Sequence, residues 1–178
     1  MTLSKKAIKE EQYKNMLLMG YDFVLKEYGI AGIPNIVINR RLSQQLARIK
    51  AAKDQYGNDT VVIEVSDRVM NYYTELEREQ IIKHELVHYA FAYLGKDFRD
   101  GSEEFENELK RLNLPSGGEM KLKGKVFIYS CSNSHNEVEL HRILKRTNVD
   151  QRICPCCGNP MKYKGEYLIT DKEKTKLD

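Results

Sequence analysis

Apolar side chains in the first part of the chain recur with the period of a helix. Between Ser4 and Tyr28 they are three or four residues apart, at Tyr13, Leu17, Tyr21, Val24, Leu25 and Tyr28. This spacing places them on one face of an α-helix. Gly29 follows directly, and glycine is the usual residue just past a helix C-terminus. The pattern therefore predicts an amphipathic helix over 4–28.

Short runs of β-branched residues replace the helical period after Pro34. Residues 36–38 and 61–65 are such runs, and both are typical of strands. A third strand is predicted between them, at about 47–53. The connection 57–59, Gly-Asn-Asp, is typical of a hairpin turn. We therefore expect a small sheet after the first helix.

Capping residues predict the helices that come next. Ser66 can cap a short helix that runs through Tyr73. Thr74 can cap the following helix, because Glu77 lies three residues later and completes a capping box. That helix is expected to run to about Leu94. Two helices are thus predicted directly after the sheet.

Helix-breaking residues separate the last third of the chain from the rest. A further helix is predicted after Ser102, and Pro115, Gly117 and Gly118 then break the chain. Three later segments have the composition of strands: 126–129, 138–144 and 167–169. The predicted organisation is a first domain over 1–115, a β-rich module over 121–170, and a charged tail over 171–178 that we expect to fray.

The composition is that of an ordinary globular protein. Hydrophobic residues make up 41% of the chain and charged residues 31%, which excludes a fully disordered protein. A length of 178 residues allows one core with a small appendage, but not two large domains. No run approaches the roughly 20 apolar residues of a membrane span, and the lysine- and glutamate-rich beginning has no apolar signal segment. We expect neither a membrane partner nor export.

The four cysteines all lie in the last third of the chain, at Cys131, Cys154, Cys156 and Cys157. Such crowding is typical of a metal knuckle and not of a secreted disulfide framework, so we expect a cytoplasmic protein. Cys154 and Cys157 are spaced C-x-x-C and precede Gly158, which suits a knuckle's tight turn. With Cys131 and His135 they would form a structural zinc site, leaving Cys156 as a spare thiol. The alternative is a ribbon that folds without metal because its first half has lost a ligand.

Basic residues gather around these cysteines, although the net charge is only +3. They are Lys121, Lys123, Lys125, Arg142, Lys145, Arg146, Arg152, Lys162 and Lys164. Such a patch can bind phosphate or can simply be a solvated surface. DNA is therefore a partner that this module could contact, and the sequence leaves both interpretations open.

The residues with the clearest chemistry lie in the predicted helix after Thr74, at His84-Glu85-Leu86-Val87-His88. Positions i and i+4 of a helix share a face, so His84 and His88 can direct two imidazoles at one metal ion. Glu85 is placed to activate a metal-bound water as the general base of an H-E-x-x-H hydrolase. The alternative is a chance histidine spacing on a helix that only packs. Apolar neighbours on both sides favour the metal, because a buried histidine pair and carboxylate are costly without a task.

A catalytic zinc ion needs three protein ligands and one open position. The remaining histidines, His135 and His141, belong to the cysteine-rich module, so a carboxylate is the better candidate. Five carboxylates follow the helix closely enough: Asp97, Asp100, Glu103, Glu104 and Glu106. The residues by themselves do not choose among them.

Four segments resemble the SprT-like metallopeptidases: Asn39-Arg40-Arg41-Leu42, Ile82 to Tyr89 around the motif, Gly95-Lys96, and an acidic segment ending in Glu104-Phe105. The resemblance covers roughly residues 37–164, and the cysteine-bearing ribbon is similar to that of bacterial members. It implies a third zinc ligand in the loop before Glu104, normally a histidine, and that position is Asp100 here. This departs from the family pattern, yet an aspartate can also bind zinc. The family includes Spartan-type proteases, which digest proteins crosslinked to DNA.

These patterns and the resemblance together predict an α+β, zincin-like domain followed by a zinc ribbon. The expected activity is zinc-dependent hydrolysis of peptide bonds in protein substrates, DNA-bound proteins among them. Glu85 would be the catalytic base, and His84, His88 and Asp100 would hold the catalytic zinc. One rival is a nucleic-acid-binding ribbon protein whose peptidase site has decayed, as Asp100 would allow. Another is a purely structural metal protein, which the presence of a general base at Glu85 disfavours.

Overall fold

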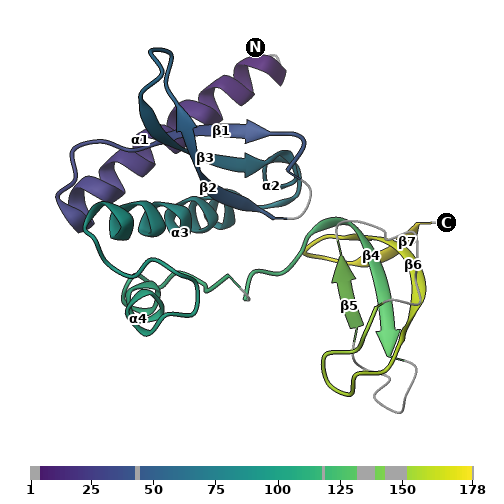
Figure 1. The fold of residues 1–178 in the computed structure, drawn as a ribbon. Coiled ribbons are helices and arrows are strands. Elements are labelled where there is room, and N and C mark those ends of the chain that lie inside the picture. Colours follow the sequence, from purple (N-terminus) through teal and green to yellow (C-terminus); the bar gives the residue numbers. More distant parts are fainter. Residues whose placement is uncertain (1–4, 43–44, 118, 132–138, 143–151, 178) are drawn as a thin grey trace. The chain divides into compact units, whose positions relative to one another are not determined.

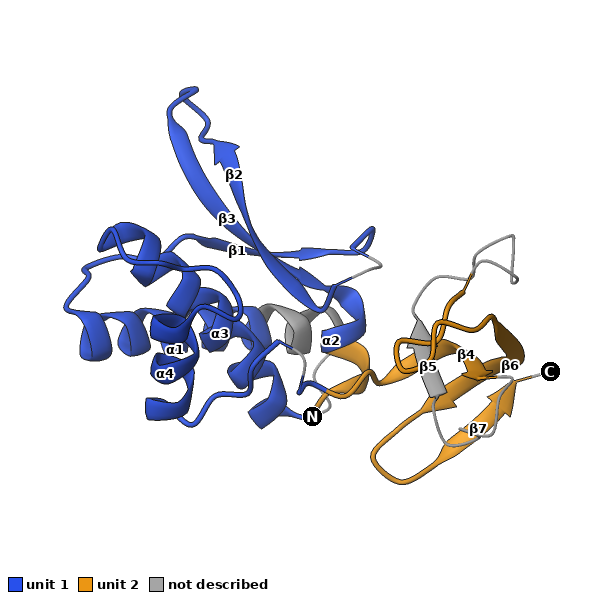
Figure 2. Ribbon diagram, turned by 60° about the horizontal axis from the view of Figure 1, so that its bottom comes forward, with its two compact units in different colours: residues 1–69, 74–120 blue, residues 70–73, 121–178 orange. Residues whose placement is uncertain are grey.

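The computed structural model describes residues 5–42, 45–117, 119–131, 139–142 and 152–177 (Figure 1). The chain forms two compact units (Figure 2). The first contains residues 1–69 and 74–120, and the second contains residues 70–73 and 121–178. The mixed α+β class that the sequence predicts is confirmed. None of the helices in these described ranges has the length and apolarity that a bilayer crossing requires.

The helices and strands of the first part of the chain follow the predicted order. They are α1 (Lys5–Tyr28), β1 (Asn35–Asn39), β2 (Ala47–Lys53), β3 (Asp59–Ser66), α2 (Asp67–Tyr72), α3 (Glu75–Tyr93) and α4 (Glu103–Arg111). The capping box that predicts α3 is present, because the Thr74 hydroxyl accepts from the Glu77 N–H and the Glu77 carboxylate accepts from the Thr74 N–H. Gly29 has a φ of 68° and follows α1, as expected for a C-terminal glycine.

The sheet of the first unit has the strand order β1-β3-β2. β1 runs parallel to β3, and β2 pairs antiparallel with β3 from Ala47 opposite Val65 to Lys53 opposite Asp59 without a register shift. Ile63 and Val65 in β3 are fully buried, which matches the alternation of a strand with one covered face. The sheet thus presents its apolar face to the helices of the unit.

The helix α3 lies at the centre of the first unit, against β2, β3, α1 and α4 (Figure 1). Its Ile82 and Leu86 are fully buried. Gly20 lets α1 approach closely, because a Cβ atom at this position would lie 3.2 Å from the Leu86 side chain. A second buried cluster joins α3 to α4 and consists of Val87, Phe91, Phe105, Leu109 and Leu114. These contacts fix α3 from several sides and so fix the residues that it carries.

The second unit is built on an antiparallel sheet of order β5-β4-β6-β7. Its strands are β4 (Gly124–Cys131), β5 (Glu139–Arg142), β6 (Met161–Ile169) and β7 (Lys174–Leu177). The core contains Tyr129, Cys131, Cys154 and Met161. Hydrophobic residues and cysteines therefore share one small core in this unit.

The expectation of a frayed tail is wrong, because Lys174–Leu177 form β7 and pair with Glu166 to Ile169 of β6. A local turn makes this pairing possible. The Thr170 hydroxyl accepts from the N–H groups of Lys172 and Glu173, and the Thr170 N–H donates to the Glu173 carbonyl. The charged composition of the segment gave no sign of this turn, because its side chains remain exposed while its backbone pairs.

Candidate metal centre

His84 and His88 lie one turn apart on α3 and are buried, with 4% and 8% of their surfaces exposed. Their Nε2 atoms are 3.2 Å apart. Asp100 comes from the loop between α3 and α4, and its Oδ1 lies 3.3 Å from His84 Nε2 and 3.4 Å from His88 Nε2. The structure thus brings together three potential ligand atoms, two from a rigid helix and one from a loop.

The spacing of these three atoms fits a tetrahedral zinc ion. Zinc holds imidazole nitrogen and carboxylate oxygen at about 2.0–2.2 Å, so two ligands at tetrahedral angles lie about 3.3–3.6 Å apart. The observed separations of 3.2, 3.3 and 3.4 Å match this range closely. Two nitrogens and one oxygen are also a donor set that zinc accepts in catalytic sites. The residues present therefore fit the metal that the sequence predicts.

Backbone carbonyls set the tautomer of both imidazoles. His84 Nδ1 lies 3.1 Å from the carbonyl oxygen of Pro115, and His88 Nδ1 lies 2.6 Å from that of Phe98. A carbonyl only accepts, so each Nδ1 carries the hydrogen and donates it. Each Nε2 is left with its lone pair directed at the other ligand atoms. Three electron-rich atoms facing one another repel unless a cation lies between them, which is the usual role of such outer hydrogen bonds around a metal.

Phe105, the third residue of α4, holds the two imidazole rings from behind. Its ring is stacked on His88 at a centroid distance of 4.2 Å and meets His84 edge to face at 5.5 Å. Phe105 is fully buried and also contacts Phe91 at 5.7 Å. Sequence reasoning did not assign this role to Phe105, and the only signal was its place at the end of the acidic segment. The carbonyls of Phe98 and Pro115 were also missed, because every residue has a carbonyl and no sequence pattern marks these two.

The loop that carries Asp100 is held on both sides of it. Asp97 accepts hydrogen bonds from the Arg99 backbone N–H at 3.1 Å and from Arg99 Nε at 2.9 Å, and these contacts lower the pKa of Asp97 to about 2. The N–H of Gly101, at a φ of 80°, donates to Glu106 at 3.0 Å. Asp100 itself remains accessible, with 66% of its side chain exposed. A metal ion held by Asp100 and the two histidines would therefore be accessible to solvent on the Asp100 side.

Three of the five carboxylates that the sequence left open as third ligand are engaged elsewhere. Asp97 pairs with Arg99, Glu104 pairs with Lys96 at 2.8 Å, and Glu106 accepts from Gly101. Asp100 is the carboxylate that joins the histidine cluster in the described part of the chain. The geometry thus favours the same residue that the family resemblance indicates.

Glu85 lies on α3 beside the two histidines and is partly buried. Burial and the nearby negative charge of Asp100 raise the pKa of its carboxyl to about 7, while a hydrogen bond from the Ile49 backbone N–H on β2 opposes this rise. Glu85 is not one of the three residues whose potential ligand atoms converge, which are His84, His88 and Asp100. A carboxylate that lies beside a metal site without binding the metal can exchange a proton with a molecule bound at that site.

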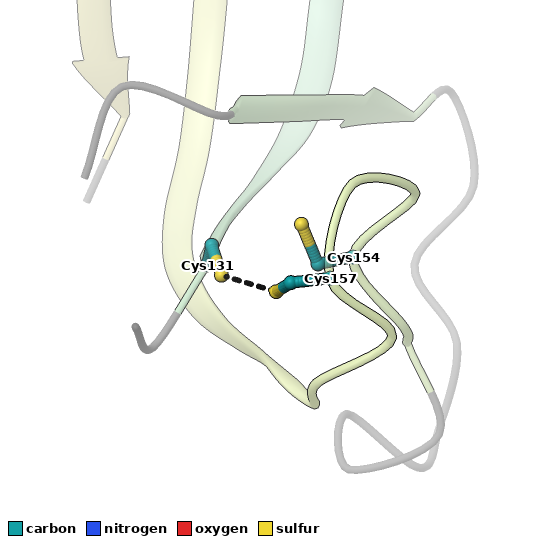
Figure 3. Close-up of side chains that lie close together, drawn as sticks. All are labelled: Cys131, Cys154 and Cys157. Atoms are coloured by element: carbon teal, nitrogen blue, oxygen red, sulfur yellow. Dashed lines mark hydrogen bonds between the residues drawn. The ribbon is translucent and has the colours of Figure 1, made fainter. Parts of the chain in front are cut away.

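A second group of potential metal ligands lies in the second unit. Its cysteines come from β4 and from the turn before β6 (Figure 3). The sulfur atoms of Cys131, Cys154 and Cys157 lie within 4.8 Å of one another, and those of Cys131 and Cys157 are 3.5 Å apart. Zinc-bound thiolates in a tetrahedral site lie about 3.8 Å apart, so this cluster is also compatible with zinc. Hydrogen bonds from the backbone N–H groups of Cys156 and Cys157 lower the pKa of Cys154 to about 7, which favours the thiolate that binds metal.

The other residues that the sequence analysis considered for the ribbon site lie outside this group of three cysteines or outside the described residues. Cys156 is exposed and is not part of the cluster, as expected for a spare thiol. Gly158 has a φ of 70°, and its N–H donates to the Cys154 carbonyl in the tight turn. His135 lies outside the described residues. His141 belongs to β5, where its backbone is opposite Ile128.

Curated proteins that are similar to this chain carry the name of one family. A protein named "Protein SprT-like" from a Geobacillus species is 30% identical over 121 residues, which is 64% of this chain and 76% of the relative. Proteins of the same name from Bacillus cereus and Geobacillus kaustophilus are 29% and 26% identical, over 65% of this chain and 76% and 78% of their own lengths. No family model matches the chain. The identity and the coverage nevertheless confirm the resemblance seen in the sequence, and the chain belongs to the SprT-like family.

Proposed function

We propose that this chain is a zinc-dependent metallopeptidase of the H-E-x-x-H type and that its first unit is a zincin-like domain. One observation carries the proposal: His84 Nε2, His88 Nε2 and Asp100 Oδ1 converge at separations that suit a tetrahedral zinc ion. The family membership supports it. Peptide bonds of protein substrates are the bonds that we expect it to hydrolyse.

The zinc ion would be held by His84, His88 and Asp100, with one position open for water or substrate. When bound, zinc supplies Lewis acidity, which polarises a carbonyl and makes a bound water more acidic. The protein residues do the remaining work. The carbonyls of Phe98 and Pro115 keep the imidazoles oriented, and Phe105 prevents the rings from turning.

Glu85 is proposed to be the general base and then the general acid. A carboxylate has two oxygens, so one can accept the Ile49 N–H while the other takes a proton from water. Glu85 would then deliver this proton to the nitrogen of the departing amine. Its position outside the cluster of ligand atoms suits a group that moves protons and does not bind metal.

For the second unit we propose a structural zinc ion held by Cys131, Cys154 and Cys157. The sequence offers His135 as the fourth ligand. Exposed lysines of this unit, among them Lys121, Lys125, Lys162 and Lys164, are candidates for contacts with DNA phosphates. Such contacts would direct the peptidase to DNA-bound proteins. The rival function, a DNA-binding protein with a decayed peptidase site, is favoured by Asp100 standing where the family normally has histidine.

The experiment that separates enzyme from binder is Glu85→Gln. We expect this variant to keep its zinc content and its fold but to lose proteolysis by about 10²–10⁴-fold, as for a missing general base. Cleavage of casein and of a DNA-bound protein would be followed with single-stranded, double-stranded and no DNA, and zinc would be counted by elemental analysis. If the wild type cleaves nothing under any of these conditions and binds DNA as well as the variant does, the decayed-site interpretation is correct.

A further inference from the structure

Three of the four cysteines of the chain lie close together in the second unit (Figure 3). The sulfur atoms of Cys131, Cys154 and Cys157 lie within 4.8 Å of one another, and Cys131 Sγ lies 3.5 Å from Cys157 Sγ. This contact joins the last residue of β4 to the turn before β6. Two thiols at this distance can share a metal ion or can be joined to each other, because their sulfur atoms need to approach by only about 1.5 Å to form a disulfide.

The three thiols differ in their access to solvent. Cys131 is 4% exposed and Cys154 is 1% exposed, so both are shielded inside the core of the second unit. Cys157 is half-buried and packs against the edge of this core. A small oxidant in solution therefore reaches the sulfur of Cys157 more readily than the other two sulfur atoms.

Cys156 is exposed and directly precedes Cys157, but it is a poor disulfide partner for it. Neighbouring Cα atoms are about 3.8 Å apart across a trans peptide bond, whereas Cα atoms joined by a disulfide are usually about 4.4–6.8 Å apart. A disulfide between Cys156 and Cys157 would therefore be strained. Cys131 approaches Cys157 from a different segment of the chain and does not have this constraint.

We propose that Cys157 is a site of oxidation by a hydroperoxide and that Cys131 resolves it, so that a Cys131–Cys157 disulfide replaces the zinc ion of the second unit. This inference goes beyond the proposed peptidase activity and rests on the proposed structural zinc. The thiolate is the form of cysteine that binds zinc and also the form that a peroxide oxidises. A zinc ion that loses two of its thiolate ligands is released.

The reaction balances with hydrogen peroxide as the oxidant. The Cys157 thiolate attacks one peroxide oxygen, so that an S–O bond forms, the O–O bond breaks, and hydroxide leaves and takes up a proton. Cys157 is now a sulfenic acid and has lost two electrons to the peroxide. The Cys131 thiolate then attacks this sulfur, so that the S–S bond forms and the S–O bond breaks, and the second hydroxide also takes up a proton. Together, the two thiolates, one peroxide and two protons give one disulfide and two water molecules.

The turn that carries Cys154 and Cys157 has backbone hydrogen bonds that do not depend on a metal ion. The Gly158 N–H donates to the Cys154 carbonyl at 2.9 Å, and the Cys154 N–H donates to the Asn159 carbonyl at 2.8 Å. A Cys131–Cys157 disulfide would also keep β4 joined to this turn, as the zinc ion does. We therefore expect the oxidised unit to keep its fold and to bind zinc again after reduction.

The test treats the full-length, zinc-loaded protein with stoichiometric hydrogen peroxide in the absence of a reductant. The dye 4-(2-pyridylazo)resorcinol measures the zinc that is released, and mass spectrometry after alkylation of the free thiols locates the disulfide. We expect release of about one zinc ion per chain, a disulfide between Cys131 and Cys157, and renewed zinc binding after reduction with dithiothreitol. The histidine site contains no thiol and should keep its ion.

Cys156→Ser is the matched control, because it removes the exposed thiol and keeps the three that converge. The rates of disulfide formation and zinc release should change by no more than about twofold in this variant. Cys131→Ser should leave Cys157 as a sulfenic acid, which dimedone traps. Cys154→Ser should still form the Cys131–Cys157 disulfide, although it has lost one zinc ligand.

Zinc that stays bound to the cysteines while their thiols remain reduced overturns this inference. A disulfide through Cys156, or loss of the reaction in Cys156→Ser, overturns it as well, because the exposed thiol is then the reactive one. A cysteine site that holds no zinc before oxidation refutes the proposed structural ion and, with it, the release of zinc. Since zinc is counted before peroxide is added, the failure of the proposed structural ion and the failure of the redox inference are distinguishable.

Discussion

Phe105 offers the sharpest test of how the candidate metal centre is held. It is fully buried, packs with Val87, Phe91 and Leu109, and stacks on His88. Truncation to alanine would cost about 3–5 kcal/mol, which endangers the fold. Phe105→Leu keeps most of the volume, and its cost should be about 1–2 kcal/mol. The loss of the flat surface behind His88 would leave the imidazole freer to turn, and zinc affinity should fall about 10- to 100-fold, as for other outer-layer partners of a metal ligand.

The matched control is Phe91→Leu. Phe91 is 2% exposed and belongs to the same cluster. Its ring meets those of Tyr28 and Phe105 edge to face, and the Lys96 ammonium group lies 4.9 Å from its centroid, but it is not stacked on His88. It should therefore lose a similar amount of stability, again about 1–2 kcal/mol, with no specific loss of zinc affinity. Urea unfolding of the metal-free proteins measures the first quantity.

Competition with a chelator measures the zinc affinity, and cobalt absorption distinguishes the two sites, because only the cysteine cluster gives thiolate charge-transfer bands. The expected result is a weakened histidine site in Phe105→Leu alone. Equal weakening of this site in Phe105→Leu and Phe91→Leu would mean that affinity follows general stability. The argument from ring orientation would then be refuted.

Two further predictions concern carboxylates. Asp100→Ala should lower the zinc content from about two ions per chain to about one, because one ligand of the histidine site is gone, whereas Glu104→Ala should keep both ions. Elemental analysis measures the zinc content of both variants. The opposite pattern would show that Glu104 is the third ligand. Arg111 lowers the pKa of Glu108 through a hydrogen bond, so the ionised form of Glu108 is favoured in the folded state. This stabilisation is complete above the ordinary pKa of 4.5 and is lost as the pH falls through the lowered folded-state value. Urea unfolding below pH 4.5 should therefore show a weaker acid dependence in Glu108→Gln than in the wild type, and equal slopes would contradict this reasoning.

Local patterns in the sequence were sufficient for most of the elements of the first unit. The helical period gave the predicted helix 4–28, which is confirmed as Lys5–Tyr28, and the capping box gave the start of α3 at Glu75. The strand predicted at 47–53, between the other two in sequence, is confirmed as β2. These features depend on interactions between residues no more than about four positions apart, which a linear pattern records directly. The histidine pair belongs to the same class, since its spacing is that of one helical turn.

The sequence did not reveal features that depend on backbone pairing or on distant contacts. The charged residues of strand β7 predict a frayed tail, because nothing in their side chains indicates the main-chain pairing with β6. Residues 70–73 group with the second unit although they precede α3, and no local signal marks this.

In the candidate metal centre, too, some features follow from local sequence and others depend on distant contacts. The sequence determined that two histidines and a glutamate share one turn of a helix, and it left five carboxylates as possible third ligands. Only the tertiary structure shows which carboxylate lies beside the histidines, because it brings Asp100 within 3.4 Å of both imidazoles while Asp97, Glu104 and Glu106 bond to other partners. It also supplied the carbonyls of Phe98 and Pro115, which are chemically identical to every other carbonyl in the chain. Their effect comes from position alone, and position across a loop is set by packing and not by the order of residues.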